Sequence, residues 1–267
     1  MTLSSHQQRI ATALVLVPFI VWIVFQSDII MATGLFVVSG FGLHEYCSMF
    51  WQNRQKNAYF IQGLLLAGIV SIAFTPALVR FVPLAVAGIF FILAGCFLRS
   101  YDQNHSQASF ADPSLLLAGI VYLPVMLQFF RFLAPVEIML VLVCTFATDT
   151  GGFYAGRLWG SAKIWPKISP KKTWAGSLGG MGLTTICCLL IGIVWGTSSW
   201  WIFIFLGLLL NIAAQFGDFF ESALKRSSGV KDSGHILPGH GGIMDRIDSL
   251  LFALPVYMLT REVITFF

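Results

Sequence analysis

Long apolar runs separated by short polar segments make up most of the chain. A helix needs about 20 mostly apolar residues to cross a bilayer. By this criterion the pattern predicts an all-α polytopic membrane protein with about nine transmembrane helices and cytoplasmic polar loops. The predicted helices cover residues 10–27, 29–50, 58–79, 82–98, 114–133, 137–156, 177–197, 199–221 and 246–265.

The composition agrees with this pattern. Of the 267 residues, 57% are hydrophobic and 10% are charged, whereas soluble domains carry about 25% charged residues. The polar stretches are too short for a separate soluble domain, so we expect one membrane-embedded domain over residues 1–267. The first apolar run, 10–25, is not followed by a small-residue cleavage site and is predicted to be the first membrane helix.

The distribution of basic residues predicts the orientation. With nine helices, 13 of the 16 lysines and arginines fall on the side that holds the N-terminus. Because cytoplasmic loops carry an excess of Lys and Arg, we expect a cytoplasmic N-terminus in the inner (plasma) membrane. The polar segments 157–176 and 222–248 are separated by two helices, so both fall on the cytoplasmic side and can face one site. The net charge of +4 therefore indicates orientation, and no nucleic-acid partner is expected.

The first polar segment is basic and follows Asp149, which ends an apolar helix. Five cations and no acid lie between residues 157 and 172, and Ser169 and Thr173 add hydroxyl groups. Several cationic donors at fixed positions suit a polyphosphate. A basic patch that touches lipid head groups is the alternative, and the nearby Asp149 favours a site. The cations are Arg157, Lys163, Lys167, Lys171 and Lys172.

Two pairs of acids flank the second polar segment. Asp218 and Glu221 end one apolar helix, and Asp245 and Asp248 begin the last one. Residues three apart share a helix face, and a carboxylate near membrane depth is costly and indicates function. Interaction with the helix dipole is the alternative for one acid of the second pair. If the two helix ends meet, the carboxylates predict an oxygen-rich Mg²⁺ site.

His240, Gly241 and Gly242 come just before the second acid pair. Glycines let the backbone approach a phosphate, to which a histidine could donate; a turn with an incidental histidine is the alternative. Basic loops and carboxylate pairs on one membrane face are typical of metal-dependent phosphoryl or nucleotidyl transfer between a soluble and a lipid substrate. No Walker P-loop or kinase motif is present.

At these residues the sequence resembles a known family. The stretch reads Ser222-x-Leu-Lys225-Arg226-x₄-Lys231-Asp232-x-Gly234-x₂-Leu237-Pro238-x-His240-Gly-Gly-Ile-x-Asp245-Arg246-Ile-Asp248. It resembles the signature of the phosphatidate cytidylyltransferases (CDP-diacylglycerol synthases) of bacterial type, and the segment from Asp149 to Thr173 is similar to that family too. Ala175 and Ser161 depart from the pattern, because an acidic or amide residue and a basic residue, respectively, are common there.

The resemblance implies that CTP and phosphatidic acid give CDP-diacylglycerol and pyrophosphate in phospholipid biosynthesis. It also implies Mg²⁺, a second, monovalent cation (K⁺) and a homodimer. The implied metal ligands are Asp218, Asp245 and Asp248. Further catalytic residues are Lys225, Arg226, Lys231, Arg246 and His240. The implied substrate-binding residues are Asp149, Arg157, Lys167, Ser169, Lys171, Lys172, Thr173, Ser222, Asp232, Gly241 and Gly242.

Two alternatives stay open at this point. One is a related membrane lipid enzyme that uses CTP on another lipid phosphate or alcohol, as a lipid kinase does. The other is a cation transporter, which predicts acids near the bilayer midplane and inverted repeats. The acids of this chain cluster at one interface instead, which disfavours the transporter.

Overall fold

The computed structural model describes residues 26–103, 109–234, 236 and 241–267. All regular elements over these ranges are helices, and Lys163 and Thr173 form an isolated antiparallel bridge. The all-α prediction is therefore confirmed. The described residues form two compact units, Gln26–Gln128 and Phe129–Phe267. The prediction of a single domain over 1–267 stays a prediction.

Seven helical segments of the described ranges are long and apolar enough to cross a membrane, as judged by length and composition. They are Asp28–Phe50, Asn53–Ala73, Val79–Asp102, Ala111–Phe132, Pro135–Trp159, Trp174–Trp195 and Trp200–Ser227. The predicted helix 10–27 lies outside the described residues except for residues 26 and 27, which are not helical. The predicted helix 246–265 is present as α10 (Met244–Arg261), which has 18 residues and carries several charges. The chain is thus a multi-pass membrane protein.

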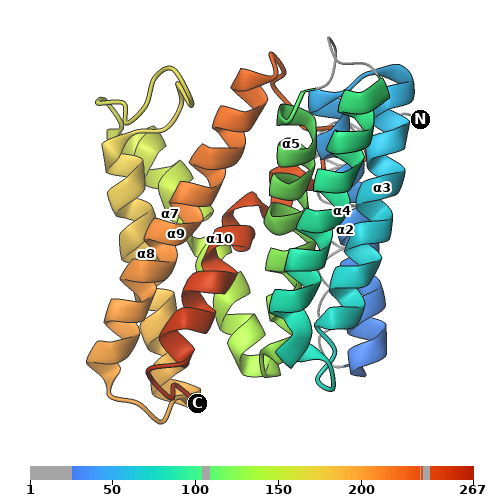
Figure 1. Cartoon of the computed structure of the whole chain (residues 1–267). Helices are drawn as coiled ribbons and strands as arrows, with labels where there is room; N and C mark the ends of the chain where they lie inside the picture. The colour runs from blue at the N-terminus through green and yellow to red at the C-terminus, as the bar shows by residue number, and fades with distance from the viewer. Residues whose placement is uncertain (1–25, 104–108, 235, 237–240) are drawn as a thin grey trace, which may run out of the picture. The chain divides into compact units, whose positions relative to one another are not determined.

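The N-terminal unit is a bundle (Figure 1). It comprises α2 (Asp28–Phe50), α3 (Asn53–Ala73), the 3₁₀ turn η1 (Val79–Phe81), α4 (Val82–Gln103), α5 (Ala111–Ile120), the π-turn η2 (Val121–Val125) and α6 (Met126–Gln128). The Tyr46 hydroxyl donates to the Leu115 carbonyl at 2.9 Å, and Trp51 Nε1 donates to Asp112 Oδ1 at 2.9 Å. These contacts tie the end of α2 to α5.

Several helix bounds of this unit differ from the prediction; α4, predicted to end at residue 98, continues to Gln103. The predicted helix 58–79 runs instead from Asn53 to Ala73. It starts earlier because the polar residues before 58 join the helix, and it ends earlier because Pro76 disfavours helix in the residue before it. The predicted helix 114–133 is interrupted by the π-turn, which contains Pro124. Proline has no N–H to donate within a helix, so one backbone carbonyl loses its usual partner. A local π-turn lets the freed backbone groups find other hydrogen-bond partners.

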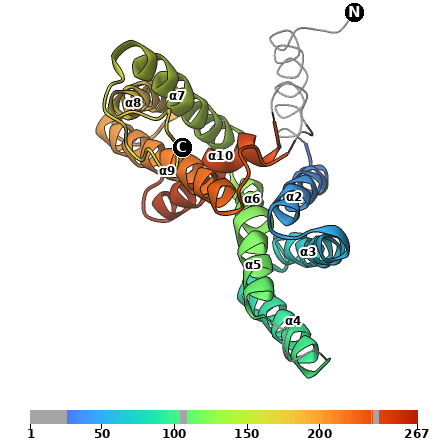
Figure 2. The ribbon, with the colours of Figure 1, turned by 90° about the horizontal axis from the view of Figure 1, so that it is seen from above.

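The C-terminal unit comprises the 3₁₀ turn η3 (Phe129–Phe132), α7 (Pro135–Trp159), α8 (Trp174–Trp195), α9 (Trp200–Ser227) and α10. Helix α7 packs against α8, α8 against α9, and α9 against α10, as seen from two directions in Figures 1 and 2. Helix α7 starts with Pro135, and the Ala134 N–H donates to Glu137 Oε2 at 2.6 Å. This is a favourable helix start, because proline has no N–H to leave unpaired there.

Small residues let α7 and α8 approach closely. A Cβ atom added at Gly151 would lie 2.6 Å from the Gly179 carbonyl oxygen, and one added at Gly180 would lie 2.7 Å from the Thr148 carbonyl oxygen. Both distances are too short for any other residue without a shift of the backbone. Close packing through small residues is a common way for membrane helices to associate. It brings Asp149 on α7 next to the first turns of α8.

Helix α9 extends beyond its predicted end at residue 221 and reaches Ser227. Ser222, Lys225 and Arg226 therefore lie on a helix and not in a loop, so the prediction of a loop over 222–248 is wrong for its first six residues. The physical reason is that residues 223–226 (Ala-Leu-Lys-Arg) are all strong helix formers, although the segment that follows is polar. Lys225 and Arg226 also fall in the last turn, where cations interact favourably with the helix dipole.

Candidate active site

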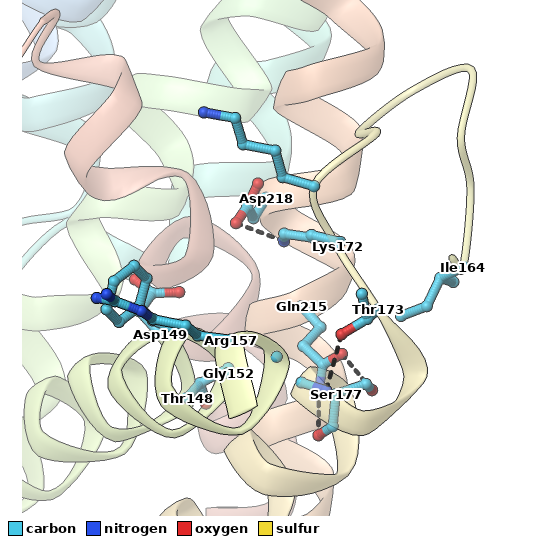
Figure 3. Close-up of a pocket in the computed structure, with 14 residues that line it drawn as sticks. Thr148, Asp149, Gly152, Arg157, Ile164, Lys172, Thr173, Ser177, Gln215 and Asp218 are labelled. Carbon is cyan, nitrogen blue, oxygen red and sulfur yellow. Dashed lines mark hydrogen bonds and ion pairs between the residues drawn. The ribbon is translucent and has the colours of Figure 1, made fainter. Parts of the chain in front are cut away.

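A cavity of about 360 Å³ lies between α7, α8 and α9 and under the segment that joins α7 to α8 (Figure 3). Six of its lining residues were predicted from the sequence: Asp149, Arg157, Lys171, Lys172, Thr173 and Asp218. Thr148, Ser177 and Gln215 also line it and were not predicted. The cavity is therefore lined both by the first basic segment and by Asp218 of the first acid pair.

The segment 160–173 forms a closed loop over this cavity. The Ile164 N–H donates to the Lys172 carbonyl at 3.3 Å, and the Trp174 N–H donates to the Ala162 carbonyl at 3.0 Å. The ring of Trp165 packs edge-on against Phe219 of α9, with 4.8 Å between ring centroids. These contacts hold the loop against α9 and so fix the position of its lysines.

Thr173 ends the loop and begins α8. Its Oγ1 accepts a hydrogen bond from the Gly176 N–H at 3.1 Å, which makes it the N-cap of this helix. Thr173 lines the cavity, as expected for a substrate-binding residue. Its buried hydroxyl nevertheless has a structural role that the sequence analysis did not assign.

Lys172 lies between the loop and α9. Its ammonium group forms an ion pair with Asp218 Oδ2 and lies 4.4 Å from the ring centroid of Phe219. Figure 3 shows the Lys172 side chain reaching Asp218 across the cavity. Asp218 Oδ1 also accepts a hydrogen bond from Ser222 Oγ at 3.4 Å. The predicted acid and the predicted phosphate-binding lysine are thus paired with each other.

A second ion-pair cluster joins α9 to the start of α10. Lys225 Nζ lies 2.5 Å from Glu221 Oε2 and 2.5 Å from Asp245 Oδ1. Asp245 Oδ2 accepts from the N–H groups of Gly242 at 2.9 Å and Ser233 at 3.3 Å. One lysine ammonium group and two backbone N–H groups therefore surround the Asp245 carboxylate, and such donors stabilise its charged form.

Asp248 lies where α9 and α10 touch. A Cβ added at Gly217 would lie 3.1 Å from the Ser249 Cα, so only a glycine allows this approach. Asp248 is buried, and its Oδ1 accepts from the Ser249 N–H at 2.7 Å. It is within electrostatic reach of Asp218 and Asp149. Carboxylates from α7, α9 and α10 thus lie close enough to influence one another's charge.

The two polar segments meet at Arg226. Its Nε donates to the Ile168 carbonyl at 3.4 Å, and its Nη1 donates to the Val230 carbonyl at 3.4 Å. The expectation that both segments face one region is therefore confirmed. Arg226 is positioned by backbone carbonyls of both segments.

The sequence model of the cytidylyltransferase family matches residues 7–264. The chain belongs to this family. The match covers both units and includes the cavity, the loop over it and the two ion-pair clusters. The family match thus covers all of the described residues except the last three.

Curated relatives of this cytidylyltransferase are similar over part of their length. A "Phosphatidate cytidylyltransferase" of Staphylococcus haemolyticus (strain JCSC1435) is 40% identical over 168 residues, which cover 60% of this chain and 63% of the relative. The enzyme of that name from Staphylococcus saprophyticus is 39% identical over 168 residues, with the same coverage. The one from Staphylococcus aureus (strain COL) is 40% identical over 157 residues, covering 57% of this chain and 60% of the relative. The chain thus spans about three fifths of the length of the relatives it matches.

Several predicted site residues of the cytidylyltransferase lie away from the cavity lining. Lys167, Lys231, Asp232 and Arg246 are exposed, although Arg246 is within electrostatic reach of Asp149. Ser169 lies in the loop, where its carbonyl accepts from the Lys172 N–H at 3.3 Å. Gly241 has a φ of 82°, a conformation that favours glycine, and precedes Gly242 at the Asp245 carboxylate. His240 lies outside the described residues.

One missed cavity residue, Gln215, had a signal in the sequence. Asn211, Gln215, Asp218 and Ser222 are spaced by four, three and four residues, in a helix that is mostly apolar up to Phe220. This spacing places all four on one face, and the prediction used only the charged member and Ser222. Ser177 and Thr148 had no comparable signal, because single hydroxyl residues in apolar helices are common.

The predicted metal ligands fit Mg²⁺ in chemistry. Among the described residues, no group of three or more His, Cys, Asp or Glu side chains is arranged to hold a metal ion. Asp218 and Asp245 each pair with a lysine ammonium group instead. Mg²⁺, however, is usually bound by one or two carboxylates together with water and substrate phosphates. Asp218 and Asp245 provide ligands of this chemical type, and each is paired with an ammonium group in this structure.

Proposed function

We propose that this cytidylyltransferase transfers CMP from CTP to phosphatidic acid and gives CDP-diacylglycerol and pyrophosphate in phospholipid biosynthesis. The cavity carries the proposal, because it places Arg157, Lys171 and Lys172 beside the carboxylates of Asp149 and Asp218. The names of the staphylococcal relatives support the choice of phosphatidate as the acceptor.

In the proposed reaction, an oxygen of the lipid phosphate attacks the α-phosphorus of CTP. The bond between this oxygen and the α-phosphorus forms, the bond to the β-phosphate oxygen breaks, and pyrophosphate leaves. The attacking oxygen is already anionic, so no dedicated base is needed. The cations Arg157, Lys171 and Lys172 neutralise the triphosphate and hold the two anionic substrates close together.

We propose Asp218 and Asp245 as Mg²⁺ ligands, with Asp248 close by, and K⁺ as a second cation. Mg²⁺ would neutralise charge on the triphosphate when bound. Lys172 and Lys225 would then exchange their carboxylate partners for phosphate oxygens. The remaining predicted site residues stay proposals, and so does a homodimer.

The proposed setting is the inner membrane, with nine spans, the N-terminus and the active site on the cytoplasmic side. The seven candidate spans, together with α10 and the apolar run 10–25, would make up this number. The excess of basic residues in the segments next to the cavity supports the cytoplasmic side.

Purified protein with phosphatidate, Mg²⁺ and CTP labelled at the α- or the γ-phosphate tests the function. We expect α-label in the lipid fraction and γ-label in released pyrophosphate. Entry of γ-label into the lipid would instead show a lipid kinase and overturn the proposal. Replacing phosphatidate with diacylglycerol is the matched control, and it should give no labelled lipid because the acceptor phosphate is missing.

A further inference from the structure

A chain of buried polar side chains runs between α7, α8 and α9 and ends at the cavity. Thr184 and Thr148 lie 2.8 Å apart at their Oγ1 atoms, and Asn211 Nδ2 donates to Thr148 Oγ1 at 3.1 Å. Gln215 Nε2 donates to Asn211 Oδ1 at 2.5 Å, and Ser177 Oγ donates to Gln215 Oε1 at 2.6 Å. Thr184 and Asn211 are fully buried. The proposed reaction uses none of these groups.

The hydrogen bonds fix which atom of Gln215 is the acceptor. Its Nε2 also donates to the Ser177 backbone carbonyl at 3.2 Å, and a carbonyl can only accept. Both N–H bonds of the amide are therefore used, and Oε1 must face the Ser177 hydroxyl. That hydroxyl donates its only hydrogen to Oε1. Figure 3 shows Gln215 and Ser177 joined in this way at the cavity wall.

This part of the cavity wall therefore offers acceptors to a ligand. Ser177 Oγ keeps its lone pairs and Gln215 Oε1 keeps one of two, and both residues line the cavity. The carboxylates of Asp149 and Asp218 add further acceptors, whereas Arg157 and Lys171 supply the positive charge. The lining thus combines neutral acceptors with cations that suit phosphates.

We propose that Ser177 and Gln215 bind hydrogen-bond donors of the nucleoside part of the nucleotide. The inference rests on the proposed function, in which CTP is a substrate. Phosphatidic acid presents ester carbonyls and phosphate oxygens, which are acceptors and gain nothing from this wall. A cytidine nucleotide carries donors in its exocyclic amino group and its ribose hydroxyls. Asn211 and Thr148 act as positioning residues that hold the amide of Gln215 in its orientation, because Asn211 contacts Gln215 directly and Thr148 is also held by the Cys144 carbonyl.

The variant Ser177→Ala tests this binding role. It removes one acceptor from the wall, leaves both N–H bonds of Gln215 paired, and suits the helix because alanine is the best helix former. We expect the KM for CTP to rise about tenfold, with kcat and the KM for phosphatidate unchanged, since the lost bond belongs to nucleotide binding. UTP lacks the exocyclic amino group and 2′-deoxy-CTP lacks one ribose hydroxyl, so these analogues show which of the two donors binds the wall. Lost discrimination against UTP assigns the amino group, and lost discrimination against 2′-deoxy-CTP assigns the ribose.

The matched control is Thr184→Val. Thr184 belongs to the same buried chain but does not line the cavity, so this variant should lower thermal stability and leave the KM for CTP within about twofold. A rise in the KM for phosphatidate in Ser177→Ala, or an unchanged KM for CTP, would overturn the inference.

If the wild-type protein makes no CDP-lipid, the proposed function fails. Calorimetric titration of CTP then tests the inference without turnover. Weaker binding of CTP to Ser177→Ala than to the wild-type protein supports it, and equal affinity or no binding to either protein overturns it.

Discussion

At the scale of single residues, the buried acids of the site depend on cationic partners to balance their charge. Lys225 is 12% exposed and lies between Glu221, which is 1% exposed, and Asp245. A buried carboxylate without a counter-ion is strongly unfavourable, because burial removes its hydration and the neighbouring negative charge repels it. Lys225 therefore holds the end of α9 to the start of α10 in addition to its proposed role with phosphates.

Replacing Lys225 tests this structural role. We expect Lys225→Met to lower the free energy of unfolding by about 3 kcal/mol, because two neighbouring carboxylates lose their shared cation. Thermal unfolding in detergent measures the change. Lys231→Met is the matched control, since Lys231 is exposed, and it should change stability by less than about 0.5 kcal/mol. The double variant Lys225→Met with Glu221→Gln should recover part of the loss, and equal losses in the single and double variants would contradict the account.

The residues of the site that carry charge could be predicted from the sequence, and most neutral ones could not. Asp218 and Lys172 stand out because charge is costly in an apolar chain. The structure adds that they are partners, which depends on how the loop 160–173 folds over α9. Ser177 and Thr148 are ordinary in composition, and their importance comes only from the packing of three helices.

At the scale of the elements, hydrophobic length predicted where helices occur but not where they end. Seven of the predicted helices of the described ranges have a counterpart among the candidate spans. The end of α9 was missed because a polar sequence can continue a helix beyond the membrane. The α7–α8 contact was not predicted, because glycines at 151, 179 and 180 indicate close packing but do not identify the partner helix.

A pair of glycine variants on α8 tests this close contact. Gly180→Ala places a Cβ 2.7 Å from the Thr148 carbonyl oxygen, whereas a Cβ at Gly182 meets no atom within 4 Å. We expect Gly180→Ala to destabilise the protein by about 1–3 kcal/mol through overpacking. Gly182→Ala should be neutral or stabilising by up to about 1 kcal/mol, because alanine restricts the unfolded chain. Equal melting temperatures for the two variants would show that α7 and α8 are not in close contact at Gly180.

At the scale of the whole molecule, the C-terminal unit has two chemically different ends. One end carries the loop 160–173 and residues 228–234, joined through Arg226. At the other end, the Thr197 N–H donates to the Phe266 carbonyl at 2.8 Å, and Ser198 Oγ donates to the Thr265 carbonyl at 2.6 Å. Helix α8 joins the two ends and is a candidate span. The ends should therefore face opposite sides of the membrane.

Cysteine labelling in intact cells tests this orientation. Single cysteines are introduced as Ser161→Cys, in the loop over the cavity, and Ser199→Cys, before α9, in a protein whose five native cysteines have been replaced. A membrane-impermeant maleimide added outside the inner membrane should label Ser199→Cys within minutes. It should label Ser161→Cys only after the membrane is opened, because the proposed orientation places the basic loop on the cytoplasmic side. Labelling of both positions from outside would mean that α8 does not cross the membrane. Labelling of Ser161→Cys alone would reverse the orientation and place the cavity away from cytoplasmic CTP.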